Sequence, residues 1–209
     1  MTLKRYSWAA PRRAALVAAL AAATLLGACA PLVVGGAMVG GVLSYSDRRS
    51  SGTQVDDEAI ELKAISRVNA ALGERGHVNI TSYNRSVLIT GEVPAEADRT
   101  TVEQTVAAVE SVRATTNELM VGFNSSISTR SNDTILTSKV KAAFLDARDL
   151  QSNAFKVVTE RSTVYLMGRV TEREAGRAAD VARAVGGVAK VVRVFEILSE
   201  AELANLPPK

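Results

Sequence analysis

The sequence predicts an α+β fold in which two small units of the order α-β-β-α-β follow one another along the chain. A strand-like segment occurs twice, as VLITGEV at residues 87–93 and as VYLMGRV at residues 164–170. Internal repeats indicate duplicated structural units. Apolar residues at helical spacing precede each segment, and a valine-rich run follows it. Each unit is therefore expected to form a small three-stranded mixed sheet with two helices.

The first unit is expected over residues 56–122. Asp56-Asp57 is suited to cap a helix with apolar residues every three to four positions. Two strands follow, joined by a tight turn at Asn84-Arg85. Gly91 lies inside the second strand, where a missing side chain indicates a bulge or a close backbone approach. A second helix and a third strand, over residues 112–121, complete the unit.

The second unit is expected over residues 133–198, after a Ser/Thr-rich linker at residues 123–132. Asn132-Asp133 is suited to cap its first helix. A longer loop, two strands, a helix and a last strand are then expected, in this order, at residues 146–153, 155–160, 163–170, 172–185 and 188–197. The tail over residues 199–209 ends in a Pro-Pro-Lys sequence and is expected to be disordered.

The N-terminus has the features of a lipoprotein signal peptide. A basic segment up to Arg13 precedes an uncharged segment rich in alanine and leucine that stops at Cys29. The sequence LGAC at residues 26–29 resembles the lipobox of bacterial lipoproteins, which implies cleavage before Cys29 and acylation of its thiol. We therefore expect a signal peptide over residues 1–28, lipidation at Cys29, and a lipidated anchor and tether over residues 29–55.

An uncleaved membrane helix is the alternative, because residues 14–46 contain no charged side chain. Pro31 and two glycine pairs argue against one continuous helix across this region. Ala30, rather than aspartate, follows the cysteine. By resemblance to Gram-negative lipoproteins, this implies sorting to the outer membrane, where the chain would be lipid-anchored and would face the periplasm.

The charge distribution argues against a nucleic-acid partner. The whole chain has a net charge of +3, but four of its 25 basic residues precede the cleavage point, and the mature chain has 21 basic and 22 acidic residues. Residues 56–122 carry a net charge of −5 and residues 130–198 a net charge of +4. This asymmetry has two interpretations that stay open: drift of solvated surfaces, or a second unit that faces an anionic partner.

Both units resemble the BON domain, a module of bacterial periplasmic and outer-membrane proteins. The resemblance rests on residues 87–93 and 164–170 and on Gly187-Val188 before the last strand, whereas the first unit has Ser111-Val112 at that position. Together with the lipobox, it makes the chain similar to the family of outer-membrane lipoproteins with two BON domains that is associated with division and envelope stress. Residues 166–175 (LMGRVTEREA) are especially close to that family.

A candidate lipid-binding face lies on the predicted helix of residues 133–147. At 100° per residue, Leu136, Val140 and Phe144 cluster on the side that forms the core. The residues that we predict to bind lipid, on the opposite face and at its edges, are Ile135, Ser138, Lys139, Lys141, Ala142 and Leu145. Apolar side chains there can enter the acyl boundary while ammonium groups meet phosphates. The alternative is that Ile135 and Leu145 pack on the first unit or on the loop after the helix.

The resemblance favours the lipid interpretation, because it implies binding of an anionic phospholipid such as phosphatidylglycerol through this helix of the second BON domain. The family has an aromatic residue where this chain has Ile135. We therefore expect an outer-membrane lipoprotein that binds anionic phospholipid and supports outer-membrane integrity. The second hypothesis is an adapter whose acidic first unit docks a protein of outer-membrane assembly or peptidoglycan remodelling at the division site.

The sequence favours neither an enzyme nor a cofactor nor a metal site. His77 is the only histidine and Cys29 the only cysteine, so the chain has no histidine pair and no free thiol after acylation. It also lacks a phosphate-binding loop and a glycine fingerprint. No catalytic residue is therefore predicted, and His77 is expected to be an ordinary strand-end residue without metal-binding partners.

Overall fold

The structure is a computed structural model that describes residues 47–73 and 75–206. Cys29, the expected signal peptide and most of the expected anchor and tether lie outside these residues. Within them, the α+β class and the two successive helix-strand-strand-helix-strand units are confirmed.

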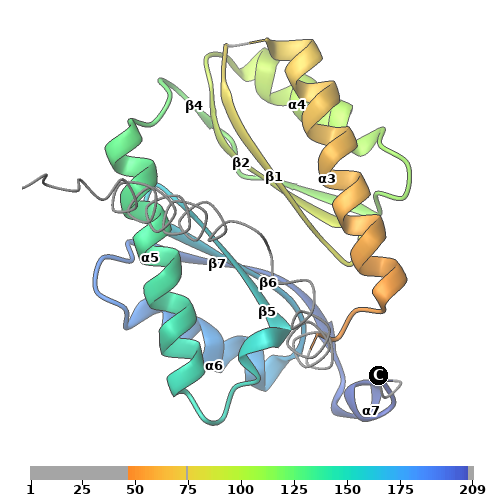
Figure 1. Cartoon of the computed structure of the whole chain (residues 1–209), viewed down its shortest axis with the longest axis vertical. Helices are drawn as coiled ribbons and strands as arrows, with labels where there is room; N and C mark the ends of the chain where they lie inside the picture. Colours follow the sequence, from red (N-terminus) through yellow and green to blue (C-terminus); the bar gives the residue numbers. More distant parts are fainter. Residues whose placement is uncertain (1–46, 74, 207–209) are drawn as a thin grey trace, which may run out of the picture. The chain divides into compact units, whose positions relative to one another are not determined.

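The first unit is a mixed sheet with two helices on one face (Figure 1). Its elements are α3 (Ser51–Leu72), β1 (His77–Tyr83), β2 (Ser86–Val93), α4 (Glu96–Ala107), β3 (Ala114–Asn117) and β4 (Met120–Val121). β2 is central: it pairs antiparallel with β1 and parallel with both β3 and β4. The core between helices and sheet is aliphatic, with Ile60, Val68, Ile89 and Val102 at most 1% exposed.

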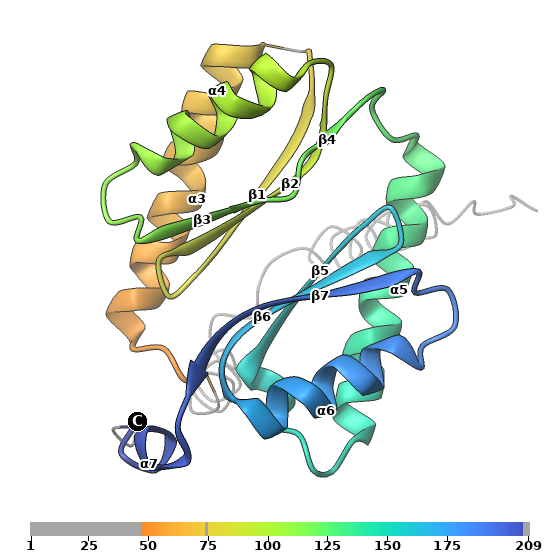
Figure 2. The ribbon, with the colours of Figure 1, turned by 180° about the vertical axis from the view of Figure 1, so that it is seen from behind.

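The second unit repeats this arrangement, and Figure 2 shows its helices α5 and α6 on one face of the sheet. Its elements are α5 (Ile127–Asp146), the 3-10 helix η2 (Ser152–Ala154), β5 (Phe155–Glu160), β6 (Thr163–Thr171), α6 (Glu172–Arg183), β7 (Lys190–Leu198) and the short α7 (Glu200–Ala204). β6 is central, antiparallel to β5 and parallel to β7. Phe144 and Phe155 make an edge-on ring contact in its core, at 5.2 Å between ring centroids.

The two units also share a small hydrophobic cluster. Leu88 alternates along β2 with Val87 and Ile89, so its side chain lies on the sheet face opposite the helices. There it is part of a buried cluster with residues from both units, namely Tyr83, Leu88, Tyr165 and Met167. The second face of each sheet is therefore covered at its centre by side chains of the other unit.

The first helix of each unit begins earlier than the sequence suggested. α3 begins at Ser51 and α5 at Ile127, not at the expected residues 56 and 133. The caps are serines: Ser50 accepts a hydrogen bond from the amide of Thr53, and Ser126 accepts one from the amide of Thr129. The expected tether over residues 29–55 and the expected linker over residues 123–132 are both too long for this reason.

Asp57 and Asp133 are therefore not helix caps. Both lie inside a helix, are nearly fully buried, and accept hydrogen bonds from the hairpin turn between the first two strands. Asp57 accepts from the amides of Asn84 and Arg85, at 2.8 and 2.7 Å, and also from the Ser82 hydroxyl at 2.6 Å.

In the second unit Asp133 accepts from the amides of Arg161 and Ser162, both at 2.8 Å. All four turn residues have positive φ, between 48° and 63°. This conformation is unfavourable for residues other than glycine, and the aspartates offset its cost by binding the turn amides. The prediction of a tight turn at Asn84-Arg85 is confirmed.

Two further expectations were wrong in detail. The third strand of the first unit is interrupted, because Asn117 Oδ1 accepts from the amide of Leu119 and Leu119 turns into the core between β3 and β4. The tail is not entirely disordered: Ser199 and Glu202 form a capping box at the start of α7. Residues 207–209 lie outside the described residues.

Gly91 is confirmed as a position of close backbone approach. Its φ is +114°, and a Cβ atom there would lie 1.9 Å from the carbonyl oxygen of His77 on the neighbouring strand. Only glycine fits this position without displacing the backbone. The pairing of β1 with β2, and with it the position of His77 opposite Glu92, depends on it.

Asp57 should be a main source of stability and of its pH dependence. Burial alone would raise the pKa of Asp57, but the hydrogen bonds from Ser82 and the turn amides lower it below its usual value. Its contribution is therefore present at neutral pH and is lost as the pH falls through the lowered pKa. We expect Asp57→Asn to cost about 3 kcal/mol at pH 7 and to flatten the loss of stability at acid pH.

Urea unfolding of the unlipidated mature chain between pH 3 and 7 measures both effects. Asp56→Asn is the matched control, because Asp56 is half-exposed and pairs only with the Arg85 guanidinium. Its cost should stay below about 1 kcal/mol. Equal costs for the two variants would contradict the role given to Asp57.

Candidate functional site

The six residues predicted to bind lipid all lie on the exposed side of α5. Ile135 is 55% exposed and Leu145 is 70% exposed. The other four, also exposed, are Ser138, Lys139, Lys141 and Ala142. On the opposite side, Leu136 is 2% exposed and packs inward with Val140 and Phe144. Within the described residues, therefore, neither Ile135 nor Leu145 is buried beneath the first unit or the loop after the helix.

The exposed apolar surface is longer than the sequence analysis indicated. Ile127, at the start of α5, is 81% exposed, and Phe123, just before the helix, is 93% exposed. Ile127 precedes Leu145 by 18 residues, which is five full turns, so the two point in the same direction about 27 Å apart. The sequence analysis missed them because it placed both in a polar linker, although the run MVGF at residues 120–123 is an apolar signal.

The basic residues on this surface differ from those on α6. Within residues 47–73 and 75–206, Lys139 and Lys141 form no ion pair with a carboxylate. Two arginines of α6, in contrast, are paired: Arg177 with Asp149 and Arg183 with Asp180, each at 2.7 Å. The ammonium groups beside Ile135 and Leu145 are therefore available for phosphate oxygens.

The end of α5 lies next to the segment that leads back toward Cys29. A groove of about 310 Å³ is lined by side chains of α5, of the loop after it and of the chain before α3, among them Asp47, Lys141, Leu145 and Phe155. Asp47 follows Cys29 by 18 residues in the sequence. An extended chain of this length spans at most about 60 Å.

Two arginines fix this segment to both units. The Arg48 guanidinium donates to both carboxylate oxygens of Glu174, each at 2.7 Å, and to the carbonyl of Arg169 at 2.8 Å. Arg49 donates to Asp57 at 2.7 Å and lies over the ring of Tyr83, 4.3 Å from its centroid. The end of the expected tether is thus part of the folded structure, so the tether ends before Arg48 and not at residue 55.

Loss of Arg48 should destabilise the fold strongly. The Arg48 and Glu174 side chains are 7% and 6% exposed, and removing one partner leaves a buried charge without compensation. Burial would raise the pKa of Glu174, and the bonds from Arg48 lower it below its usual value. We expect Arg48→Ala to cost about 3 kcal/mol at pH 7, and the deficit to shrink at acid pH as Glu174 becomes protonated.

Chemical denaturation of the parent chain and of the Arg48→Ala variant at pH 7 and pH 4 tests this expectation. Arg177→Ala removes the same type of side chain from an ion pair whose members are 47% and 53% exposed, and should cost less than about 1 kcal/mol. A deficit for Arg48→Ala that is as small, or that grows toward acid pH, would be inconsistent with a buried pair.

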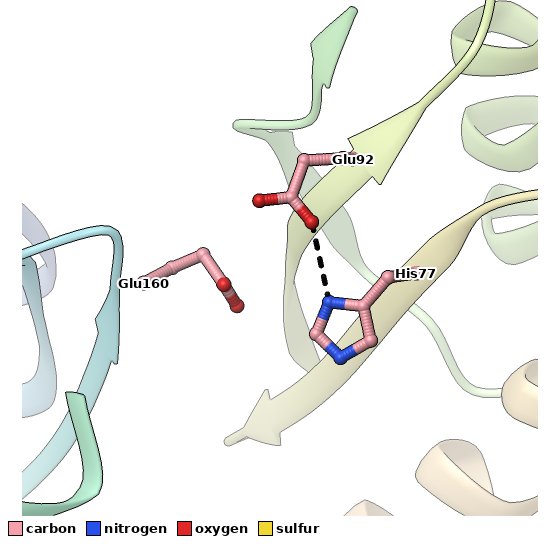
Figure 3. A group of neighbouring side chains, drawn as sticks. All are labelled: His77, Glu92 and Glu160. Atoms are coloured by element: carbon pink, nitrogen blue, oxygen red, sulfur yellow. Dashed lines mark ion pairs between the residues drawn. The ribbon is translucent and has the colours of Figure 1, made fainter. Parts of the chain in front are cut away.

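A second cluster forms around the only histidine. His77 Nδ1 lies 3.4 Å from Glu92 Oε2, and Glu160 of the second unit faces both (Figure 3). The sequence analysis did not anticipate that two carboxylates lie beside His77; that no metal binds there stays a prediction. The two carboxylates come from β2 and from the other unit, 15 and 83 residues away in the sequence, and only the fold brings them together.

The pKa values of the two carboxylates are shifted in opposite directions. Glu92 accepts from the Arg161 guanidinium and from the amide of Ser125 at 3.1 Å. Burial opposes its charge, but the bond from Arg161 keeps the pKa of Glu92 below its usual value. Glu160 accepts a hydrogen bond from the side-chain amide of Asn79 at 2.8 Å, and burial raises the pKa of Glu160.

A comparison with protein families shows what these units are. The model of the BON domain matches residues 56–122 and residues 132–199, more than half of the chain. The chain therefore belongs to the BON-domain family, with two BON domains in tandem.

Three relatives share most of this organisation. The chain is 38% identical to the outer membrane lipoprotein DolP of Haemophilus influenzae over 182 residues, covering 86% of this chain and 93% of that protein. It is 34% identical to a 21 kDa hemolysin of Actinobacillus pleuropneumoniae, covering 71% of this chain and 78% of that one. It is 29% identical to osmotically-inducible protein Y of Escherichia coli, with coverage of 70% and 75%. Among the described helices of this chain, none is both long enough and apolar enough to span a bilayer.

Proposed function

We propose that this protein is an outer-membrane lipoprotein, anchored through Cys29, that binds anionic phospholipid through α5 and supports outer-membrane integrity. The name of the H. influenzae relative supports the outer-membrane location. The observation that carries lipid binding is the pair of exposed apolar side chains, Ile135 and Leu145, beside two lysines that have no carboxylate partner in the described part of the chain.

The expected strength of this interaction suits an anchored protein. Burying an aliphatic side chain contributes about 1.5–3 kcal/mol, and each lysine near an anionic surface about 1 kcal/mol. Such a sum gives weak binding to free vesicles once the cost of association is subtracted. Acyl chains on Cys29 would hold the domain near the bilayer, where the effective concentration of lipid makes a weak contact sufficient.

Substitution of the apolar residues tests the proposal. Ile135→Glu or Leu145→Glu should abolish sedimentation of the unlipidated mature chain with phosphatidylglycerol vesicles, because a carboxylate on this face is repelled by the headgroups and cannot enter the acyl boundary. Lys139→Ala combined with Lys141→Ala should weaken binding roughly thirtyfold in 0.1 M salt, and much less in 0.5 M salt.

Leu62→Glu is the matched control, because Leu62 is 71% exposed on α3 of the first unit. It should leave vesicle binding unchanged. Circular dichroism and urea midpoints establish that all variants are folded. Unchanged binding by folded Ile135→Glu and Leu145→Glu proteins would remove α5 as the lipid-binding element.

The adapter hypothesis is the second candidate, and a groove favours it. About 580 Å³ of open space lies between the edges of the two sheets, lined among others by Arg113, Glu118, Arg193 and Phe195. Charged rims with an apolar floor suit a polypeptide segment. A photo-cross-linker at Glu118 should then trap a stoichiometric protein partner in cells, whereas the same group at Glu58 on α3 should not. Equal labelling at both positions would count against an adapter site in the groove.

A further inference from the structure

The cluster of His77, Glu92 and Glu160 is built on rigid elements of both BON units. His77 and Glu92 are direct partners in the pairing of β1 with β2, so their side chains lie on the same face of that sheet. Glu160 ends β5, immediately before the turn that Asp133 holds. Sites built on strands in this way keep their geometry better than sites on loops.

The distances suit three ligands of one small ion. The candidate ligand atoms all lie within 4.8 Å of one another. Bonds of about 2.1 Å in a tetrahedral site place neighbouring ligand atoms roughly 3.4 Å apart. The separation of His77 Nδ1 and Glu92 Oε2, at 3.4 Å, already has this value. A rotation of the Glu160 side chain can bring its oxygen to the same separation.

One buried atom of the cluster lacks a hydrogen bond. His77 Nδ1 is buried and takes part in no hydrogen bond, although Glu92 Oε2 lies 3.4 Å away. Glu160 accepts its hydrogen bond through Oε2, and in the described part of the chain its Oε1 has no donor. Buried polar atoms are rarely left unsatisfied in folded proteins, so His77 Nδ1 indicates a missing group beside these carboxylates.

The missing group should be a cation. Arg161 compensates the charge of Glu92 through Oε1, on the side away from His77. Glu160 has no cationic side chain bonded to it within the described residues. Two ionised carboxylates beside one guanidinium leave a net negative charge that one bound cation would offset.

The cluster is also open to solvent. A groove of about 240 Å³ reaches it and is lined among others by His77, Asn79, Thr137 and Glu160. An ion can enter by this route, and water can occupy the fourth ligand position.

We propose that His77, Glu92 and Glu160 bind one divalent ion of the zinc class, which joins the two BON units. An imidazole nitrogen with two carboxylate oxygens favours Zn²⁺ over Mg²⁺ or Ca²⁺, which prefer oxygen ligands alone. Two ligands come from the first unit and one from the second, so the bound ion would act as a cross-link between them. This proposal is independent of lipid binding.

The test uses the mature chain, purified without a histidine tag and titrated with zinc sulfate in a calorimeter. One ion should bind per chain, and X-ray absorption of the zinc-loaded protein should show only nitrogen and oxygen ligands, one of them an imidazole. His77→Gln should weaken binding at least 100-fold and Glu160→Gln at least tenfold. Magnesium chloride should give no binding.

Glu58→Gln is the control, because Glu58 is an exposed carboxylate on α3. It should bind zinc as the parent chain does. The proposal is overturned if the parent chain binds no zinc at a one-to-one ratio, or if folded His77→Gln binds it equally well. It is also overturned if the absorption spectrum lacks an imidazole, a result that does not depend on the folding of any variant.

Discussion

The fold depends on one interaction that occurs twice, the bond between a buried aspartate of the first helix and the turn of the hairpin beneath it. Asp57 and Asp133 each bind two turn amides whose residues have positive φ. A carboxylate bound in this way fixes both the position of the helix along the sheet and its rotation about its own axis. In α5 this rotation decides that Leu136 and Val140 point inward, and therefore that Ile135 and Leu145 point outward.

The position of the proposed lipid-binding surface is thus a consequence of a buried polar contact on the other side of the same helix. Asp133 and Leu136 share the inner side of α5, and Ile135 lies between them in the sequence but faces out. A surface that depends on one fixed rotation can present two apolar side chains without exposing those of the core.

The sequence was sufficient for the fold class, the two units and the exposed face of α5, because all three follow from repeats and from helical periodicity. It was not sufficient for the roles of Asp57 and Asp133. An aspartate near an expected helix start suggests a cap, and only the fold shows that the helix begins earlier, with Ser50 or Ser126 as its cap. The His77 cluster could not be predicted either, because Glu160 lies in the other unit and long-range proximity leaves no local signal.

The hydrophobic cluster of Tyr83, Leu88, Tyr165 and Met167 bears on how such a protein could arise. Each unit covers a hydrophobic patch of the other unit that would otherwise be exposed to solvent. Either unit produced alone would therefore be prone to aggregation. Once the duplicated halves had come to shield each other, neither could be discarded without loss of solubility. The first unit is then retained because it keeps the second unit soluble, even where its own surface binds no ligand.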